Sequence, residues 1–166
     1  MARAPFQILV LPYRRSAGLE VAVLHRADYD AWQFVSGGGE GDETPISAAR
    51  REGREEAGIP ETLPYLPLDA ISMVPACWFS AWTTWPAEIF VVPEHSFAVD
   101  LGDQAIALSD EHLQVRWLHF DDAVALLKFD SNRVALWELH ERLFPAPRIK
   151  RFAFDARHDG CRCSKA

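Results

Sequence analysis

Cysteine is scarce in this chain, with three among its 166 residues. So few cysteines exclude a fold that depends on several disulfides, and they fit a reducing compartment. Cys77 lies in an apolar stretch, where we expect it to be part of the core. Cys161 and Cys163 form a CxC pair near the C-terminus, which without further ligands at zinc spacing is only a weak metal-binding signal.

An excess of basic residues and long apolar runs are also missing. The formal net charge is −7, and because neutralising phosphates requires a basic surface, we expect neither nucleic acid nor an anionic membrane as a partner. No apolar run is long enough to span a bilayer, and Pro12 and Arg14-Arg15 interrupt the first one before any signal-like cleavage site. These absences predict a cytoplasmic protein.

The chain nevertheless has enough apolar material for one core, since 49% of its 166 residues are hydrophobic. No repeat, low-complexity linker or shift in composition marks a second domain. We therefore expect a single domain over residues 1–150 and a flexible tail over residues 151–166. Apolar residues in the 76–86 region could serve a homodimer as easily as a substrate, so a homodimer stays an open alternative.

Alternating apolar and β-branched runs predict strands along most of the chain. The runs 6–13 and 18–25 form a hairpin, 31–35 is a short strand, and 68–75, 87–92 and 113–118 are further strands. Asp121 begins a helix that ends at Leu127, and Ser131 caps a last helix. The apolar face of that helix would cover the sheet, with Val134, Leu136, Trp137, Leu139 and Leu143. The prediction is an α/β fold, an α/β/α sandwich with a mixed central sheet.

The most informative segment is GGGEGDETPISAARREGREEAGI, residues 37–59. Thr44 and Pro45 predict the start of a helix, as N-cap and first-turn residues, and Gly58 followed by Pro60 predicts its end. The functional pattern consists of Gly37, Glu43, Arg51-Glu52, Glu55-Glu56, Gly58 and Ile59 at fixed spacings.

Three carboxylates converge on one face of this helix, because residues three and four apart are neighbours there. Glu52, Glu55 and Glu56 would repel one another, and they lie at the C-terminal end of the helix, where the helix dipole disfavours acids. A solvated row of ion pairs is the simpler interpretation of a charge run, but these positions would be poor choices for stability alone. Oxygen-only ligands favour magnesium, with manganese as the alternative.

This pattern resembles the box of the Nudix hydrolase family, whose members cleave a nucleoside diphosphate linked to another group and bind divalent cations. By position, the resemblance makes Glu52 and Glu56 the leading metal ligands and Glu55 a further ligand or base. Gly37 would contribute its backbone carbonyl.

The resemblance also assigns Arg51, which would hold Glu43 and brace the loop on the helix. One residue departs from the family pattern, because Gly53 stands where a bulky apolar residue is usual. Glycine inside a helix costs about 1 kcal/mol relative to alanine, so Gly53 either weakens the helix or lets it pack unusually close to a strand.

Three further segments look like the bacterial dihydroneopterin triphosphate pyrophosphatase branch of that family, namely WQFVSG (32–37), EHLQVRWL (111–118) and SNRVALWE (131–138). This likeness implies that Glu111, from the loop before the last strand, lies near the box metals. Such a carboxylate could complete the metal shell or act as general base. A solvent-facing acid in a polar loop is the competing interpretation.

Contacts to the phosphates or the ring of a substrate are assigned to four residues near strand ends and the glycine loop, which are Arg3, His25, Arg26 and Ser36. A flat base or pterin could stack on one of Trp78, Trp82 and Trp85, and the sequence does not choose among them.

We therefore expect a pyrophosphohydrolase that uses magnesium to hydrolyse a nucleoside or pterin triphosphate, such as a dNTP or dihydroneopterin triphosphate, to the monophosphate and pyrophosphate. Hydrolysis of ADP-ribose or of a dinucleoside polyphosphate is an alternative, because those substrates share the diphosphate. A non-catalytic nucleotide-sensing module of the same fold is a second alternative. The sensing module is disfavoured because every box carboxylate is present.

Overall fold

The computed structural model describes residues 2–145. Its strands are β1 (Arg3–Arg15), β2 (Leu19–Arg26), β3 (Trp32–Gln33), β4 (Val35–Glu40), β5 (Tyr65–Pro75), β6 (Val91–Asp100) and β7 (His112–His119). Its α-helices are α1 (Pro45–Ala57), α2 (Phe120–Leu126) and α3 (Asp130–Leu143), and two short 3₁₀ turns, η1 (Ala76–Trp78) and η2 (Ser80–Thr84), follow β5. The expected tail, with Cys161 and Cys163, lies outside the described residues.

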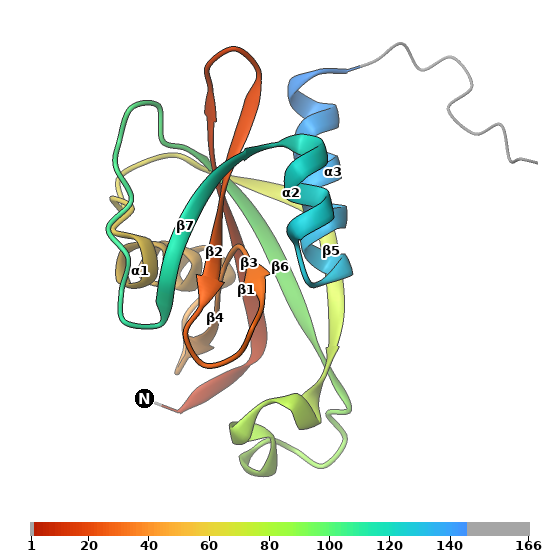
Figure 1. Ribbon diagram of the computed structural model, residues 1–166. Coiled ribbons are helices and arrows are strands. Elements are labelled where there is room, and N and C mark those ends of the chain that lie inside the picture. Colours follow the sequence, from red (N-terminus) through yellow and green to blue (C-terminus); the bar gives the residue numbers. More distant parts are fainter. Residues whose placement is uncertain (1, 146–166) are drawn as a thin grey trace, which may run out of the picture.

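The strands form one mixed sheet, in the order β3-β2-β1-β6-β5, with β4 paired to β1 and β7 paired to β2. The predicted hairpin is present, because β1 and β2 pair antiparallel. The β1–β6 pair is parallel, and the other pairs are antiparallel. Helix α1 covers one face, and α2 and α3 cover the other (Figure 1).

The two cores follow directly from the alternation of side chains along β1. Leu9, Leu11 and Tyr13 belong to a buried cluster with residues of α2 and α3. Ile8 and Val10 belong to the opposite cluster, with alanines of α1. Since successive side chains of a strand point to opposite faces, an almost wholly apolar strand requires cover on both faces. The predicted α/β/α sandwich is confirmed.

Helix α1 begins and ends where the sequence predicts. The Thr44 side chain accepts a hydrogen bond from the Ser47 backbone at 3.3 Å, and the Ser47 hydroxyl accepts one from the Thr44 backbone at 2.9 Å. Pro45 is the first helical residue. Gly58 ends the helix with φ of 66°, a conformation that glycine adopts without steric cost. These local signals fix the helix that carries the glutamates.

Gly53 lets α1 approach β5 closely, which was one of its two predicted effects. A Cβ at this position would lie 2.3 Å from the hydroxyl oxygen of Tyr65, so any larger residue requires a shift. That hydroxyl is buried without a hydrogen-bond partner among the described residues, and burial raises the pKa of Tyr65 to about 12.

One predicted loop and one predicted strand were placed incorrectly. The glycine-rich stretch expected as a loop is itself a strand, β4, and the short run 31–35 contains β3 and overlaps β4 only at Val35. Its glycines are poor strand formers in isolation. They form a strand here because β1 pairs with them, Ile8 opposite Gly37 and Gln7 opposite Gly38. Residues 87–90 are not strand, because pairing between β5 and β6 begins only at Pro75 and Val91, and β6 continues to Asp100.

Burial was also predicted wrongly at several apolar positions. Cys77 is exposed rather than in the core, because it lies in the lobe of 3₁₀ turns that extends beyond the end of the sheet (Figure 1). Val134 and Trp137 of α3 are about half exposed, at 52% and 51%, while Leu136 and Leu139 carry the packing. Ser131 lies inside α3, whose N-cap position is Phe129. Within residues 2–145, no helix is both long and apolar enough to cross a bilayer.

Candidate active site

Arg51 joins the glycine strand, the loop and α1. Its Nε donates to Glu43 Oε1 at 2.9 Å and its Nη2 donates to Glu43 Oε2 at 3.0 Å. The same Nη2 reaches the carbonyl oxygen of Gly38 in β4 at 2.8 Å. These bonds hold the pKa of Glu43 below its ordinary value. The predicted contact between Arg51 and Glu43 is present, and such bidentate pairs are stronger than single ones.

Glu52 packs directly against the backbone of β4. A Cβ on Gly37 would lie 2.0 Å from Glu52 Cδ, so any larger residue there would displace the Glu52 side chain from its present position. The Glu52 side chain is 14% exposed and lies 3.0 Å from Arg51 Nη1. Burial, followed by the charge of Glu56, raises the pKa of Glu52 to about 7. Arg51 therefore compensates the carboxylate only in part.

Glu55 faces solvent more than its neighbours do. Its side chain is 46% exposed and forms ion pairs with Arg51 and Arg54, both at 3.1 Å. Such partly exposed pairs contribute little to stability. Glu55 is thus free to exchange these partners for another cation at small cost.

Glu56 forms a buried pair with His112, a residue that sequence reasoning largely missed. The distance between His112 Nε2 and Glu56 Oε2 is 2.8 Å, and the two side chains are 0% and 3% exposed. Burial raises the pKa of Glu56, and His112 opposes that shift. The residues are 56 positions apart, and the only available signal was that His112 follows Glu111 at the start of the last strand.

Glu111 lies in the turn before β7, exposed and close to the box. Its carbonyl accepts a hydrogen bond from Ala27 at 2.8 Å, and its charge contributes to the raised pKa of Glu56. With Arg26, Asp28 and Asp110 it lines a shallow cavity. The structure therefore brings Glu111 near the box glutamates, as the sequence predicted.

A divalent cation suits the oxygen donors gathered here. Within residues 2–145, no three His, Cys, Asp or Glu side chains are arranged as a ready metal site, because Glu52 and Glu55 turn toward Arg51 and Glu56 turns toward His112. The raised pKa values of Glu52 and Glu56 nonetheless show that their charge is under-compensated. Carboxylate and carbonyl oxygens are the ligands of hard cations.

Two of the predicted substrate-binding residues lie beside the glutamates. Arg3 packs on Gly38, where a Cβ would meet its Cζ at 2.3 Å, and is attracted by the charge of Glu52. Ser36 precedes Gly37, its hydroxyl accepts a hydrogen bond from Gln33 Nε2 at 2.7 Å, and its backbone bonds to the Glu56 carboxylate.

The other two lie farther along β2. Arg26 forms an ion pair with Asp28 at 2.6 Å and lines the shallow cavity with Glu111. His25 stacks on Trp32, with ring centroids 4.7 Å apart, and its Nε2 lies 2.9 Å from Asp30. Arg26 is thus close to the site, whereas His25 has partners of its own.

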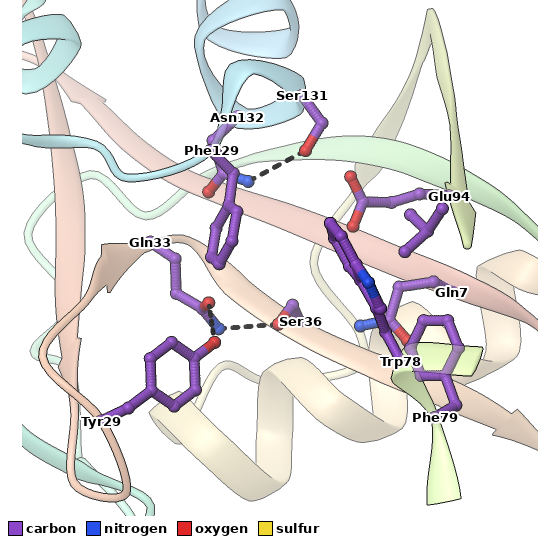
Figure 2. Close-up of a pocket in the computed structure, with 11 residues that line it drawn as sticks. Gln7, Tyr29, Gln33, Ser36, Trp78, Phe79, Glu94, Phe129, Ser131 and Asn132 are labelled. Carbon is purple, nitrogen blue, oxygen red and sulfur yellow. Dashed lines mark hydrogen bonds between the residues drawn. The ribbon is translucent and has the colours of Figure 1, made fainter. Parts of the chain in front are cut away.

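A cavity of about 200 Å³ opens next to Ser36 (Figure 2). This is several times the roughly 30 Å³ that one water occupies in the liquid, so the cavity admits a ligand group. Its aromatic walls include Trp78, Phe79 and Phe129. Of the three tryptophans that the sequence left open, Trp78 lines this cavity, whereas Trp85 donates its indole N–H to the carbonyl of Arg3 at 2.8 Å.

Comparison with known proteins decides the family. The NUDIX domain model matches residues 6–139. The chain belongs to the Nudix family. It is 32% identical over 146 residues to the dihydroneopterin triphosphate diphosphatase of Escherichia coli K12. This match covers 81% of this chain and 91% of that protein. The Nudix resemblance and the expected enzyme class, a pyrophosphohydrolase, are confirmed.

Solved structures agree with this Nudix assignment. A crystal structure of a NUDIX hydrolase from Listeria monocytogenes matches with a TM-score of 0.76 and 41% identity, covering 84% of this chain and 94% of that one. The E. coli dihydroneopterin triphosphate pyrophosphohydrolase matches with a TM-score of 0.70 and 30% identity, covering 86% and 99%.

Proposed function

We propose that this Nudix enzyme hydrolyses a pterin or nucleoside triphosphate, with dihydroneopterin triphosphate as the first candidate, to the monophosphate and pyrophosphate. One observation carries the proposal: the box glutamates and the aromatic cavity meet at Ser36, so a flat ring and its phosphates can be bound side by side. The similarity to an E. coli diphosphatase of that name over most of both chains supports the pterin.

Glu52, Glu55, Glu56 and Glu111, with the carbonyl oxygen of Gly37, are the proposed ligands of magnesium, with manganese as the alternative. When bound, the cation would neutralise phosphate oxygens and polarise the phosphorus that water attacks. Arg51 keeps α1 and β4 in register through Glu43 and Gly38. His112 holds the Glu56 carboxylate in a single orientation.

Proton transfer is assigned to Glu111 or Glu56. As the water oxygen bonds to phosphorus and the bridging oxygen departs with pyrophosphate, one of these carboxylates accepts the water proton. Glu111 is exposed and can be reached by solvent, whereas Glu56 is buried against His112. This difference favours Glu111 as the base.

Cations near the site would orient the phosphates. Arg3 beside Glu52 and Arg26 beside Glu111 are the proposed charged contacts, with the Ser36 hydroxyl between the cavity and the box. His25 could contact the phosphates only after breaking its hydrogen bond to Asp30. The partner is a small phosphorylated molecule, and the scarcity of cysteine supports a cytoplasmic location.

The experiment is a substrate panel with magnesium or with EDTA. It includes dihydroneopterin triphosphate, dNTPs, ADP-ribose and diadenosine polyphosphates, with products separated by chromatography. Glu56→Gln is the inactive control, because it removes a ligand charge while keeping a side chain of the same shape. Pyrophosphate released chiefly from the pterin supports the proposal. Preferential hydrolysis of ADP-ribose or of a diadenosine polyphosphate would replace the pterin triphosphate as the proposed substrate. Binding of a nucleotide without turnover would favour a sensing module.

A further inference from the structure

Glu94 is a buried carboxylate inside the aromatic cavity, outside the Nudix box. It lies on β6, is 7% exposed, and pairs in register with Gln7 of β1, which lines the same cavity. Figure 2 shows its carboxylate pointing to the side of the cavity where Ser131 lies, and Ser131 donates a hydrogen bond to it. Burial raises the pKa of Glu94.

One oxygen of this carboxylate, Oε1, has no hydrogen-bond partner within residues 2–145. Two donors that line the same cavity are engaged elsewhere, since Gln33 Nε2 bonds to Ser36 and Asn132 Nδ2 bonds to Ser131. A buried carboxylate oxygen without a hydrogen-bond partner is costly. A purely structural role would be filled better by an apolar residue, so this position is suited to a ligand that brings N–H donors.

We propose that Glu94 is a specificity-determining residue that accepts two hydrogen bonds from the ring N–H and the 2-amino group of a 2-amino-4-oxo-pyrimidine ring, the edge that guanine and pterins share. This inference rests on the proposed function and names the ring that the site selects. Two parallel N–H groups match the two oxygens of a carboxylate, as a guanidinium does. Each oxygen has further acceptor capacity, so the bond from Ser131 is retained.

The aromatic side chains explain how such a ring would be held. Trp78 and Phe79 from the 3₁₀ lobe and Phe129 before α3 line the cavity around Glu94 (Figure 2), and flat rings pack well against aromatic faces. Adenine presents a ring nitrogen lone pair beside a single amino group. That lone pair would face the carboxylate, so adenine is disfavoured.

The test compares dGTP with dITP, which differ only in the 2-amino group. Equilibrium binding is measured in EDTA, where turnover is suppressed and the phosphates contribute equally to both ligands. Wild-type protein should bind dGTP at least about 10-fold more tightly, as expected for one hydrogen bond to a charged group. Glu94→Gln should reduce this ratio several-fold, because a hydrogen bond to a neutral amide oxygen contributes less than one to a carboxylate. Glu88→Gln, the same change at an exposed position outside the cavity, should keep the wild-type ratio.

Equal affinities in wild-type protein, or an unchanged ratio in Glu94→Gln, would overturn the assignment. If Glu94→Gln does not fold by circular dichroism, 1-methyl-dGTP replaces it, because in this ligand a methyl group stands in place of the ring N–H proton. It should then bind wild-type protein at least about 10-fold less tightly than dGTP, and equal binding would overturn the proposal. Turnover of dihydroneopterin triphosphate against dGTP separates the two sources of this ring. If no substrate is hydrolysed with magnesium, the proposed function is wrong. The binding ratios measured in EDTA would still test the role of Glu94, because they do not depend on turnover.

Discussion

Replacing Glu52 by glutamine should stabilise the metal-free protein, and the gain should depend on pH. Burial and the charge of Glu56 raise the pKa of Glu52 from 4.5 to about 7. Below pH 4.5 the Glu52 carboxyl is protonated in both the folded and the unfolded state, so it does not change the free energy of unfolding. Between about pH 4.5 and 7 the unfolded chain releases its proton first, so the free energy of unfolding falls as pH rises, and above pH 7 the loss is complete.

The size of the effect follows from the shift. One pKa unit corresponds to about 1.4 kcal/mol, so ionised Glu52 lowers the stability of wild-type protein by about 3 kcal/mol at pH 8 and by about 1 kcal/mol or less at pH 5. The side chain is only 14% exposed, so solvent screening is limited. In Glu52→Gln this loss is absent, and for a chain of this length Tm should rise by about 6–12 °C at pH 8.

The assay is thermal and urea unfolding in EDTA at pH 5, 6.5 and 8, followed by circular dichroism. Glu55→Gln is the matched control, because its side chain is 46% exposed on the same helix and should change stability by no more than about 0.5 kcal/mol. Magnesium should stabilise wild-type protein more than Glu52→Gln. An equal stability difference at pH 5 and pH 8, or a loss of stability in Glu52→Gln at pH 8, would refute the reasoning.

Three further changes test other contacts. Arg51→Lys loses the bidentate bonds to Glu43 and should lower the free energy of unfolding in urea by about 1–3 kcal/mol; unchanged stability would contradict the bracing role. Gly53→Ala should destabilise, because its Cβ would lie 2.3 Å from the Tyr65 hydroxyl, yet in a Tyr65→Phe background it should stabilise by about 1 kcal/mol. An equal loss in both backgrounds, measured by melting, would exclude that contact as the cause. Glu111→Gln should lower kcat about 100-fold or more with little change in KM if Glu111 is the base, whereas a change in KM alone would make it a binding residue.

The parts of the fold that sequence predicted well depend on local signals. Thr44, Pro45 and Gly58 define α1 through contacts with their own neighbours, so their effect is visible in a short window. The strand β4 was missed because its glycines form a strand only when β1 pairs with them. Cys77 was expected in the core because its neighbours in the sequence are apolar. Apolar neighbours predict burial only where the chain packs on the sheet, and at Cys77 the chain has left the sheet.

The same distinction separates the parts of the site. Glu52, Glu55 and Glu56 are three and four residues apart, so helical geometry alone brings them together. His112 and Glu94 lie 56 and 38 positions beyond Glu56. Only the folded sheet, in which β7 pairs with β2 and β6 pairs with β1, brings His112 to Glu56 and Glu94 to the cavity that Ser36 also lines.

Glu52, Glu56 and Glu94 share one physical property that sequence cannot display, since burial raises the pKa of each. A fold selected for stability alone would replace such groups with apolar side chains of similar volume. Two of them belong to the Nudix box, next to Ser36, and the third lies across the aromatic cavity that Ser36 also lines. The proposed cation at Glu52 and Glu56 and the proposed N–H donors at Glu94 would offset this common cost, which is the physical ground for placing the substrate between them.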